Sequence, residues 1–164
     1  MFVNARSIIE RETGTGIEIV IQIRNKPSEG GKRIELPGDR VEEFESLVNA
    51  LTREVREETG LEVVQIEGLD TRVETHDADA TVECLSPFAV TQTTRGPVDS
   101  MGVYFRCRAT GQLLGTGDET EKPEWILVAV VAEWLTTEPE RFSWVDRAGL
   151  WFYLKHRAER RMDH

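Results

Sequence analysis

Hydrophobic and polar residues alternate along the first third of the chain in a pattern typical of β-strands. Val- and Ile-rich stretches at residues 2–10 and 17–24 flank Thr13-Gly14-Thr15-Gly16, which has the composition of a hairpin turn. Residues 27–31 contain two glycines and predict a loop, and residues 34–36 predict a short strand that ends at Pro37. The N-terminal third therefore predicts three strands joined by turns.

The clearest helical pattern covers residues 45–59. Leu47, Val48, Leu51 and Val55 recur at helical spacing, and Gly60 lies where a left-handed C-cap is expected. An amphipathic helix is therefore predicted here, with its apolar side packed on the rest of the protein.

The remainder of the chain is predicted to contain further strands and a second helical region. Residues 63–74, 80–92 and 98–110 are rich in β-branched or aromatic residues and are separated by turn clusters. The uncharged run Trp125 to Val131 predicts a short strand buried on both faces, with a short helix from near Ala132 and a last helix over about Asp146 to Arg160. The order β-β-β-α-β-β-β-α predicts an α/β fold in which helices pack on a mixed sheet.

Length and composition limit the architecture. The 164 residues, 39% hydrophobic and 30% charged, show no repeat, linker or low-complexity segment, which predicts a single domain over residues 1–164. The longest uncharged apolar run, eight residues from Trp125 to Ala132, is far shorter than the roughly 20 that a membrane helix needs. The first residues also lack the pattern of a signal peptide, so a cytoplasmic protein is expected.

The charge distribution excludes some functions and singles out one segment. With 20 basic and 30 acidic residues the net charge is −10, which argues against a broad nucleic-acid or anionic-membrane surface. Residues 35–62 hold nine acids and three bases, so this stretch alone carries −6. Cys84 and Cys107 form no CxxC motif, and reduced thiols are the simplest interpretation, with one disulfide as the alternative.

Two glutamates lie on the wrong side of the predicted helix for a solvated face. With Leu47 at 0° and 100° per residue, Leu51 and Val55 define the apolar stripe, Glu58 falls within it at about 20°, and Glu54 lies on its edge at about 340°. An ionised carboxylate on a buried face is costly unless it is paired or binds a metal. Geometry alone leaves open a solvated helix end and a site for a hard cation such as Mg²⁺, Mn²⁺ or Ca²⁺.

The stretch LPGDRVEEFESLVNALTREVREETGL, residues 36–61, resembles the Nudix box, G-x5-E-x7-R-E-U-x-E-E-x-G-U, in which U is aliphatic. Eight of the nine defined positions match: Glu45, Arg53, Glu54, Val55, Glu57, Glu58, Gly60 and Leu61. The leading glycine of the box is Asp39 here, and Glu43-Phe44 replaces the Pro-Gly that is usual within the family's loop. Asp tolerates a left-handed φ, so we expect the loop to persist with Asp39 in it.

The resemblance implies an α/β/α sandwich with a loop-helix-loop catalytic element, and Mg²⁺- or Mn²⁺-dependent hydrolysis of a diphosphate joined to another moiety. By motif position, Glu54, Glu57, Glu58 and the Gly38 carbonyl are implied as metal ligands. Arg53 is implied to orient Glu54, and Glu45 to support the loop, in which Asp39 also lies. The family often adds a loop acid before a late Trp-containing strand, for which Glu119 is the favoured candidate and Glu121 the next.

The remaining candidates concern the substrate and rest on residue type alone. Arg24 and Arg40 flank the predicted helix segment and have the charge to bind phosphate oxygens, and Phe88 has a ring that can stack on a base. Solvated surface charge and core packing are the ordinary alternatives for these residues. A loop acid without function is likewise the alternative for Glu119.

The combined interpretation is a pyrophosphohydrolase that acts on a nucleoside diphosphate derivative. One alternative, supported by Asp39, is a Nudix-fold binding or regulatory module with reduced or lost catalysis. A calcium-binding structural protein is the other, although no EF-hand loop is present. The expected partner is a small molecule rather than nucleic acid or a membrane, and the resemblance allows for a homodimer.

Overall fold

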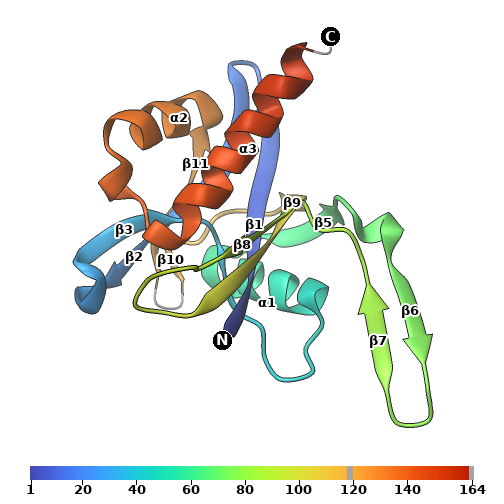
Figure 1. Cartoon of the computed structure of the whole chain (residues 1–164). Coiled ribbons are helices and arrows are strands. Elements are labelled where there is room, and N and C mark those ends of the chain that lie inside the picture. Colours follow the sequence, from blue (N-terminus) through green and yellow to red (C-terminus); the bar gives the residue numbers. More distant parts are fainter. Residues whose placement is uncertain (118–119, 163–164) are drawn as a thin grey trace.

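The computed structural model describes residues 1–117 and 120–162, which form a mixed α/β fold (Figure 1). The helices are α1 (Leu47–Thr59), α2 (Val128–Thr137) and α3 (Trp144–Met162), with short 3-10 turns η1 (Pro27–Glu29), η2 (Leu69–Thr71) and η3 (Pro139–Arg141). The strands are β1 (Phe2–Thr13), β2 (Gly16–Lys26), β3 (Gly31–Glu35), β4 (Gly38–Arg40), β5 (Glu62–Ile66), β6 (Val73–His76), β7 (Thr81–Cys84), β8 (Ala89–Gln92), β9 (Ser100–Thr110), β10 (Thr116–Gly117) and β11 (Thr120–Leu127).

The long strand β1 organises the main sheet. Within the described residues the sheet follows the order β10-β11-β2-β1-β9-β5, with β3 paired to β2, β4 to β1 and β8 to β9. Strand β1 runs antiparallel to β2, with Glu10 opposite Ile19, and parallel to β9, with Phe2 opposite Ser100. The sheet is therefore mixed, as the sequence predicts.

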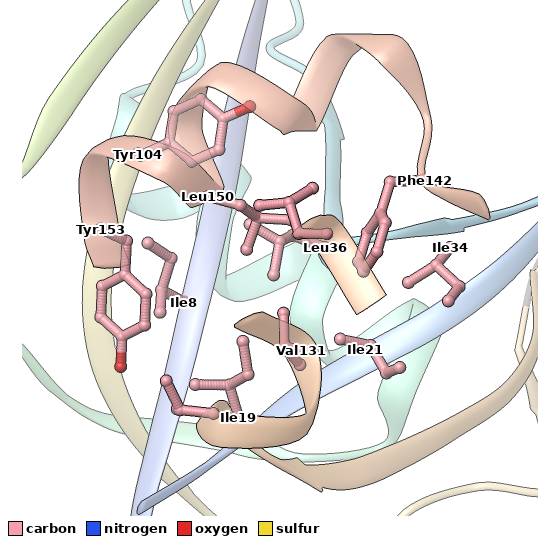
Figure 2. Packing of buried hydrophobic residues seen from close by; sticks show 12 residues of the cluster. Ile8, Ile19, Ile21, Ile34, Leu36, Tyr104, Val131, Phe142, Leu150 and Tyr153 are labelled. Carbon is pink, nitrogen blue, oxygen red and sulfur yellow. The ribbon is translucent and has the colours of Figure 1, made fainter. Parts of the chain in front are cut away.

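Helices cover both faces of this sheet. Helix α1 packs through Ala50 and Leu51 against Ala5, Val103 and Phe105. Helices α2 and α3 pack on the opposite face, where Figure 2 shows their side chains meeting those of β1, β2 and β3. This second core contains Ile8, Ile19, Ile21, Ile34, Val131, Leu150 and Tyr153, all buried. Because side chains alternate between faces along a strand, Ile8 and Ile9 contribute to different cores. The three layers confirm the predicted sandwich.

Strands β6 and β7 form a separate hairpin that extends away from the main sheet (Figure 1). Val73 lies opposite Cys84 at its base, and His76 lies opposite Thr81 near its tip. The sequence predicts continuous strands at 63–74 and 80–92, whereas each splits in two, with η2 between β5 and β6 and an irregular segment between β7 and β8. Each predicted strand therefore lies partly in the main sheet and partly in the hairpin.

One predicted strand is wrong over half its length. The apolar run Trp125 to Val131 is the end of β11 followed by the start of α2, which begins at Val128. Strand pairing ends where Leu127 lies opposite Glu18, and Val128, Val131 and Leu135 then face the core at helical spacing. The sequence does not indicate this change from strand to helix, because the run is apolar throughout and has no turn residue between its halves. Periodicity does not distinguish a short buried strand from a buried helical turn.

Two expectations from composition can be compared with the structure. None of the helices in residues 1–117 and 120–162 has the length and apolar character needed to span a membrane. Cys84 is exposed and Cys107 is buried, and both are free thiols, so the alternative of a disulfide between them is wrong.

Candidate active site

Helix α1 presents two glutamates to the protein interior. The Ser46 side chain caps its first turn by accepting a hydrogen bond from the Asn49 amide at 3.1 Å, and Gly60 ends it in a left-handed conformation. The residues Glu54 and Glu58 are only 9% and 4% exposed, which is the burial that the helical wheel predicts. The Glu57 side chain, on the flank of the helix, is 44% exposed.

Glu58 is held at the edge of strands β2 and β4. Its Oε2 atom accepts hydrogen bonds from the Gly38 amide at 2.8 Å and from Gln22 Nε2 at 2.9 Å. Burial raises the pKa of the Glu58 carboxyl to about 8, against the opposing effect of these two hydrogen bonds. Without a cation nearby, this group is therefore largely protonated at neutral pH.

Arg53 connects the helix to the loop that precedes it. Its Nε and Nη2 atoms donate to the two carboxylate oxygens of Glu45 at 2.8 and 2.9 Å, and its Nη1 atom donates to Glu54. These bonds lower the pKa of Glu45, while burial raises that of Glu54 despite its contact with Arg53. Arg53 Nη2 also lies 3.3 Å from the Arg40 carbonyl, so one guanidinium ties α1 to β4 and to the loop.

Strand β4 approaches β1 so closely that only glycine fits at position 38. Gly38 has a φ of 137°, and a Cβ atom there would lie 2.1 Å from the Ala5 carbonyl oxygen. The following residue, Asp39, pairs with Ala5 as part of the strand. Among the described non-glycine residues a positive φ occurs at Phe44 and Lys122 and not at Asp39, so the left-handed conformation that Asp tolerates is not used at this position. Position 39 does not require the freedom of glycine in this fold.

The carboxylate of Asp39 instead organises its neighbours. Its Oδ1 atom accepts a bond from the Arg40 amide at 2.8 Å, and its Oδ2 atom lies 3.3 Å from Arg24 Nη2. Arg24 also approaches Glu35, at 3.8 Å. These contacts fix the side chain of Arg24, which is largely buried.

A buried polar cluster underlies β4 and was not identified from the sequence. Arg6 Nη1 donates to the carbonyls of Leu36 at 3.2 Å and Gly38 at 2.7 Å. Its guanidinium also lies 3.9 Å from Asp146 and 4.0 Å from Glu35. The available signal was the interruption of apolar strands by single polar residues, Arg6 and Gln22, at positions where a side chain faces the interior.

A cavity of about 220 Å³ opens beside Asp39 and Arg40. Four basic side chains line it, and Asp39 is the only acid among the lining residues, which are Phe2, Asn4, Arg6, Arg24, Lys26, Asp39, Arg40, Val98, Ser100, Trp144 and Val145. The Arg40 guanidinium lies over the Phe2 ring at 3.5 Å from its centre. The combination of positive charge and aromatic rings suits a ligand with phosphate groups and a planar base.

A larger hollow is less suited to an anion. It has a volume of about 770 Å³ and separates the start of α1 from the β6–β7 hairpin. Its walls carry Glu45, Glu74, Asp79 and Glu83, with Arg72 as the only basic lining residue. This negative charge opposes the binding of a polyphosphate.

The structure brings most of the predicted site residues together. Arg53 contacts Glu45, Glu54, Glu57 and the Arg40 carbonyl, while Gly38 contacts Glu58. Phe88 lies elsewhere, with its ring packed edge-on against Phe152 and His156 at 5.4 and 5.2 Å, and it does not line the cavity. The predicted Glu119 lies outside the described residues.

The donor atoms of this site fit a hard divalent cation. Carboxylate and carbonyl oxygens are the ligands that Mg²⁺ and Mn²⁺ favour, and Gln22 adds a buried Oε1 atom that has no hydrogen-bond partner among the described residues. Over the same residues, no three His, Cys, Asp or Glu side chains are clustered closely enough to hold a metal by themselves. Binding therefore requires Glu54 and Glu58 to turn from their present partners or the ligand to supply oxygens of its own.

Comparison with known proteins agrees with this fold. The sequence model of the NUDIX domain matches residues 1–148. The structure is similar to the solution structure of the E. coli ORF135 protein, with a TM-score of 0.64 and 20% identity over 98% of this chain and 93% of the other. It is also similar to the MutT protein from Methanosarcina mazei Go1, with a TM-score of 0.57 and 18% identity over 94% of each chain.

A third similar structure is that of MutT described for Aliivibrio salmonicida and Vibrio cholerae, with a TM-score of 0.57 and 19% identity over 91% of this chain and 92% of that one. No curated protein matched the sequence. The domain match covers most of the chain, including the loop, helix and strands that form the site. The chain therefore belongs to the Nudix family of hydrolases, which act on phosphoric anhydride bonds.

Proposed function

We propose that this protein is a metal-dependent pyrophosphohydrolase that cleaves the diphosphate linkage of a nucleoside diphosphate derivative by attack of water at phosphorus. One observation carries the proposal: two buried carboxylates on α1 are connected by hydrogen bonds to β4, and Asp39 and Arg40 of β4 line a basic cavity that also contains aromatic rings. Arg53 makes the connection, because it binds Glu54 and also the carbonyl of Arg40, which lines that cavity.

Glu54, Glu57, Glu58 and the Gly38 carbonyl are the proposed metal ligands, and Glu119 stays a prediction for the same role. A bound Mg²⁺ or Mn²⁺ ion supplies neutralisation of the diphosphate charge and a lower pKa for water at the site. Arg53 holds Glu54 in position, and its bonds to Glu45 fix the loop. A carboxylate of this set accepts the proton of the attacking water.

Substrate binding is assigned to the walls of the 220 Å³ cavity. Arg24 and Arg40 provide the positive charge that phosphate oxygens require. Phe2 and Trp144 provide rings for contact with a base, the role predicted for Phe88 from the sequence. The proposed substrate is therefore a small nucleotide derivative, and a cytoplasmic location stays a prediction from the sequence.

The test is Mg²⁺-dependent hydrolysis across a panel of diphosphate compounds. The panel contains nucleoside triphosphates and their oxidised forms, sugar nucleotides, ADP-ribose, NADH, coenzyme A and dinucleoside polyphosphates. Wild type is compared with Glu58→Gln and with the control Glu62→Gln, which makes the same change at an exposed residue paired with Arg56. We expect Glu58→Gln to lower kcat by about 100-fold or more and the control to retain activity.

Two outcomes would contradict the proposal. Equal turnover by wild type and Glu58→Gln would show that the buried carboxylates do not perform the reaction. Binding of a panel compound by wild type, measured by calorimetry, without turnover of any compound would favour a binding or regulatory module. The oligomeric state, including a homodimer, is measured separately by light scattering.

A further inference from the structure

Arg6 contacts the backbone of Gly38, one of the residues through which β4 is joined to helix α1. Its buried guanidinium donates from a single nitrogen to the carbonyls on both sides of Pro37, those of Leu36 and Gly38. The Gly38 amide donates in turn to Glu58. Both peptide groups of Gly38 are thus fixed, the carbonyl by Arg6 and the amide by Glu58.

Arg6 is itself anchored from the opposite layer. Its Nε atom lies 3.9 Å from Asp146 Oδ1, and Asp146, fully buried in the first turn of α3, accepts bonds from the Tyr104 hydroxyl at 2.6 Å and the Leu36 amide at 2.9 Å. Continuous contacts therefore run from α3 through Asp146, Arg6 and Gly38 to Glu58 on α1.

Stability alone is a weak reason for this arrangement. Replacing a buried ion pair by apolar residues of similar volume is often neutral or stabilising, because removing two charges from water is costly. The Gly38 carbonyl that Arg6 binds is, however, one of the proposed metal ligands. A carbonyl oxygen has two lone pairs, so it retains one for a second partner. An orienting function explains why a charged group is placed here.

We propose that Arg6, anchored by Asp146 and Tyr104, is a positioning residue that holds the Gly38 carbonyl in the orientation required for metal binding and hydrolysis. This inference rests on the proposed function. It predicts that loss of Arg6 weakens metal binding and lowers kcat while the KM for substrate changes little, because Arg6 acts through Gly38.

The test compares Arg6→Met, Arg6→Lys and Tyr104→Phe with a matched control. Ser7→Ala is the control. It removes the hydrogen bond from Ser7 Oγ to the adjacent Pro37 carbonyl, at 2.9 Å, but keeps the hydrogen bond from the Ser7 amide to the same carbonyl, at 2.8 Å. Mn²⁺ binding is measured by electron paramagnetic resonance without substrate, and kcat and KM are measured with Mg²⁺. Arg6→Met is expected to lose about 10- to 100-fold in Mn²⁺ affinity and in kcat, with KM changed less than about twofold.

Arg6→Lys is expected to recover part of this loss, and Ser7→Ala is expected to match wild type. If Arg6→Met fails to fold, Tyr104→Phe becomes the test, because it removes only the hydroxyl that binds Asp146. A several-fold loss in Mn²⁺ affinity is expected for Tyr104→Phe. Wild-type Mn²⁺ affinity and kcat in a folded Arg6→Met would overturn the inference. If Arg6→Met does not fold, the same result in Tyr104→Phe would overturn it.

The two proposals fail separately. If wild type hydrolyses no compound but Arg6→Met still weakens Mn²⁺ binding, the positioning function stands and the proposed reaction is wrong. If wild type is active and Arg6→Met has wild-type values, the reaction stands and Arg6 is only part of the core.

Discussion

At the scale of single residues, Glu58 combines two properties that oppose one another. It is buried at the end of an apolar helix face, and it accepts hydrogen bonds that favour its charged form. Burial dominates and raises the pKa to about 8, whereas the unfolded chain has the ordinary value of 4.5. The folded protein therefore binds a proton more tightly than the unfolded chain at this position.

This difference makes the stability of the metal-free protein depend on pH. The contribution of the protonated carboxyl is complete below about pH 4.5 and is lost as the pH rises through about 8, because the unfolded chain releases its proton first. We expect the free energy of unfolding to fall by roughly 2–4 kcal/mol between pH 5 and 8. The measurement is the free energy of unfolding by urea at each pH, in the presence of EDTA to keep the protein free of metal.

Glu58→Gln is the control for this prediction, because the amide stays neutral and can still accept from Gly38. Its free energy of unfolding should depend less on pH and exceed that of wild type at pH 8. Burial raises the pKa of Glu35 and Glu54 in the same direction, so part of the dependence remains in the variant. Parallel pH profiles for the two proteins would show that burial of Glu58 does not determine its titration.

Gly38 is expected to tolerate no side chain. In Gly38→Ala the new Cβ atom would lie 2.1 Å from the Ala5 carbonyl, at a φ of 137°. Separating β4 from β1 should lower the free energy of unfolding by more than about 3 kcal/mol, measured by urea denaturation. Gly14→Ala is the matched control, since no atom lies within 4 Å of its Cβ, and it should change stability by less than about 0.5 kcal/mol. Equal stability of the two variants would contradict the close approach of the strands.

At the scale of elements, the loop before α1 contains its own backbone strain. Phe44 has a φ of 59° and a fully exposed side chain, so a left-handed conformation is imposed on a residue that gains nothing from burial. Phe44→Gly should be more stable than Phe44→Ala by about 1 kcal/mol, because only glycine adopts this φ freely. Thermal unfolding of the pair isolates the backbone effect, since both variants remove the ring. A more stable alanine variant would contradict it.

The elements that local pattern determines were predicted from the sequence. Helix α1 follows from apolar spacing and its C-terminal glycine, and the buried positions of Glu54 and Glu58 follow from the same wheel. The boundary between β11 and α2 does not follow, because residues on both sides of Val128 are apolar and only pairing with β2 determines where the strand ends. The β6–β7 hairpin was missed for a different reason: the predicted strands run through Gly68 and Asp70 and through Ser86 and Pro87, although these turn-forming residues mark the two bends at its base.

Apart from Arg24, which was proposed from its charge alone, the candidate site was predicted only as far as one motif extends. Residues 36–61 are contiguous, so the predicted set reaches Gly38, Arg53, Glu54 and Glu58. Arg6 and Asp146 both bind the backbone of Leu36, but they are 30 and 110 residues away from it in the sequence. No local pattern in a single sequence indicates such pairings, because strand order and register bring these residues together.

At the scale of the whole molecule, the described residues join the hairpin to the body at its base (Figure 1). The segment beneath it is fixed by the Ser86 amide, which donates to Thr71 Oγ1 at 2.8 Å. Gly68 packs closely against the same segment, because a Cβ atom added there would lie 2.0 Å from the Ser86 carbonyl oxygen. Strands β6 and β7 pair only with one another among the described strands, and most of their side chains are exposed. A two-stranded hairpin adds little stability by itself.

The hairpin should therefore be removable without loss of the fold. Val73 and Cys84 lie opposite one another, so replacing residues 74–83 by Asn-Gly closes the chain with a two-residue turn. We expect cooperative urea unfolding with a free energy within about 1 kcal/mol of wild type, because no core side chain is removed. Gly68→Ala, which forces the base apart, should by contrast cost more than about 2 kcal/mol. Loss of cooperative unfolding in the shortened protein would show that the hairpin is required for the fold, and equal stability of Gly68→Ala and wild type would show that its base is not fixed as described.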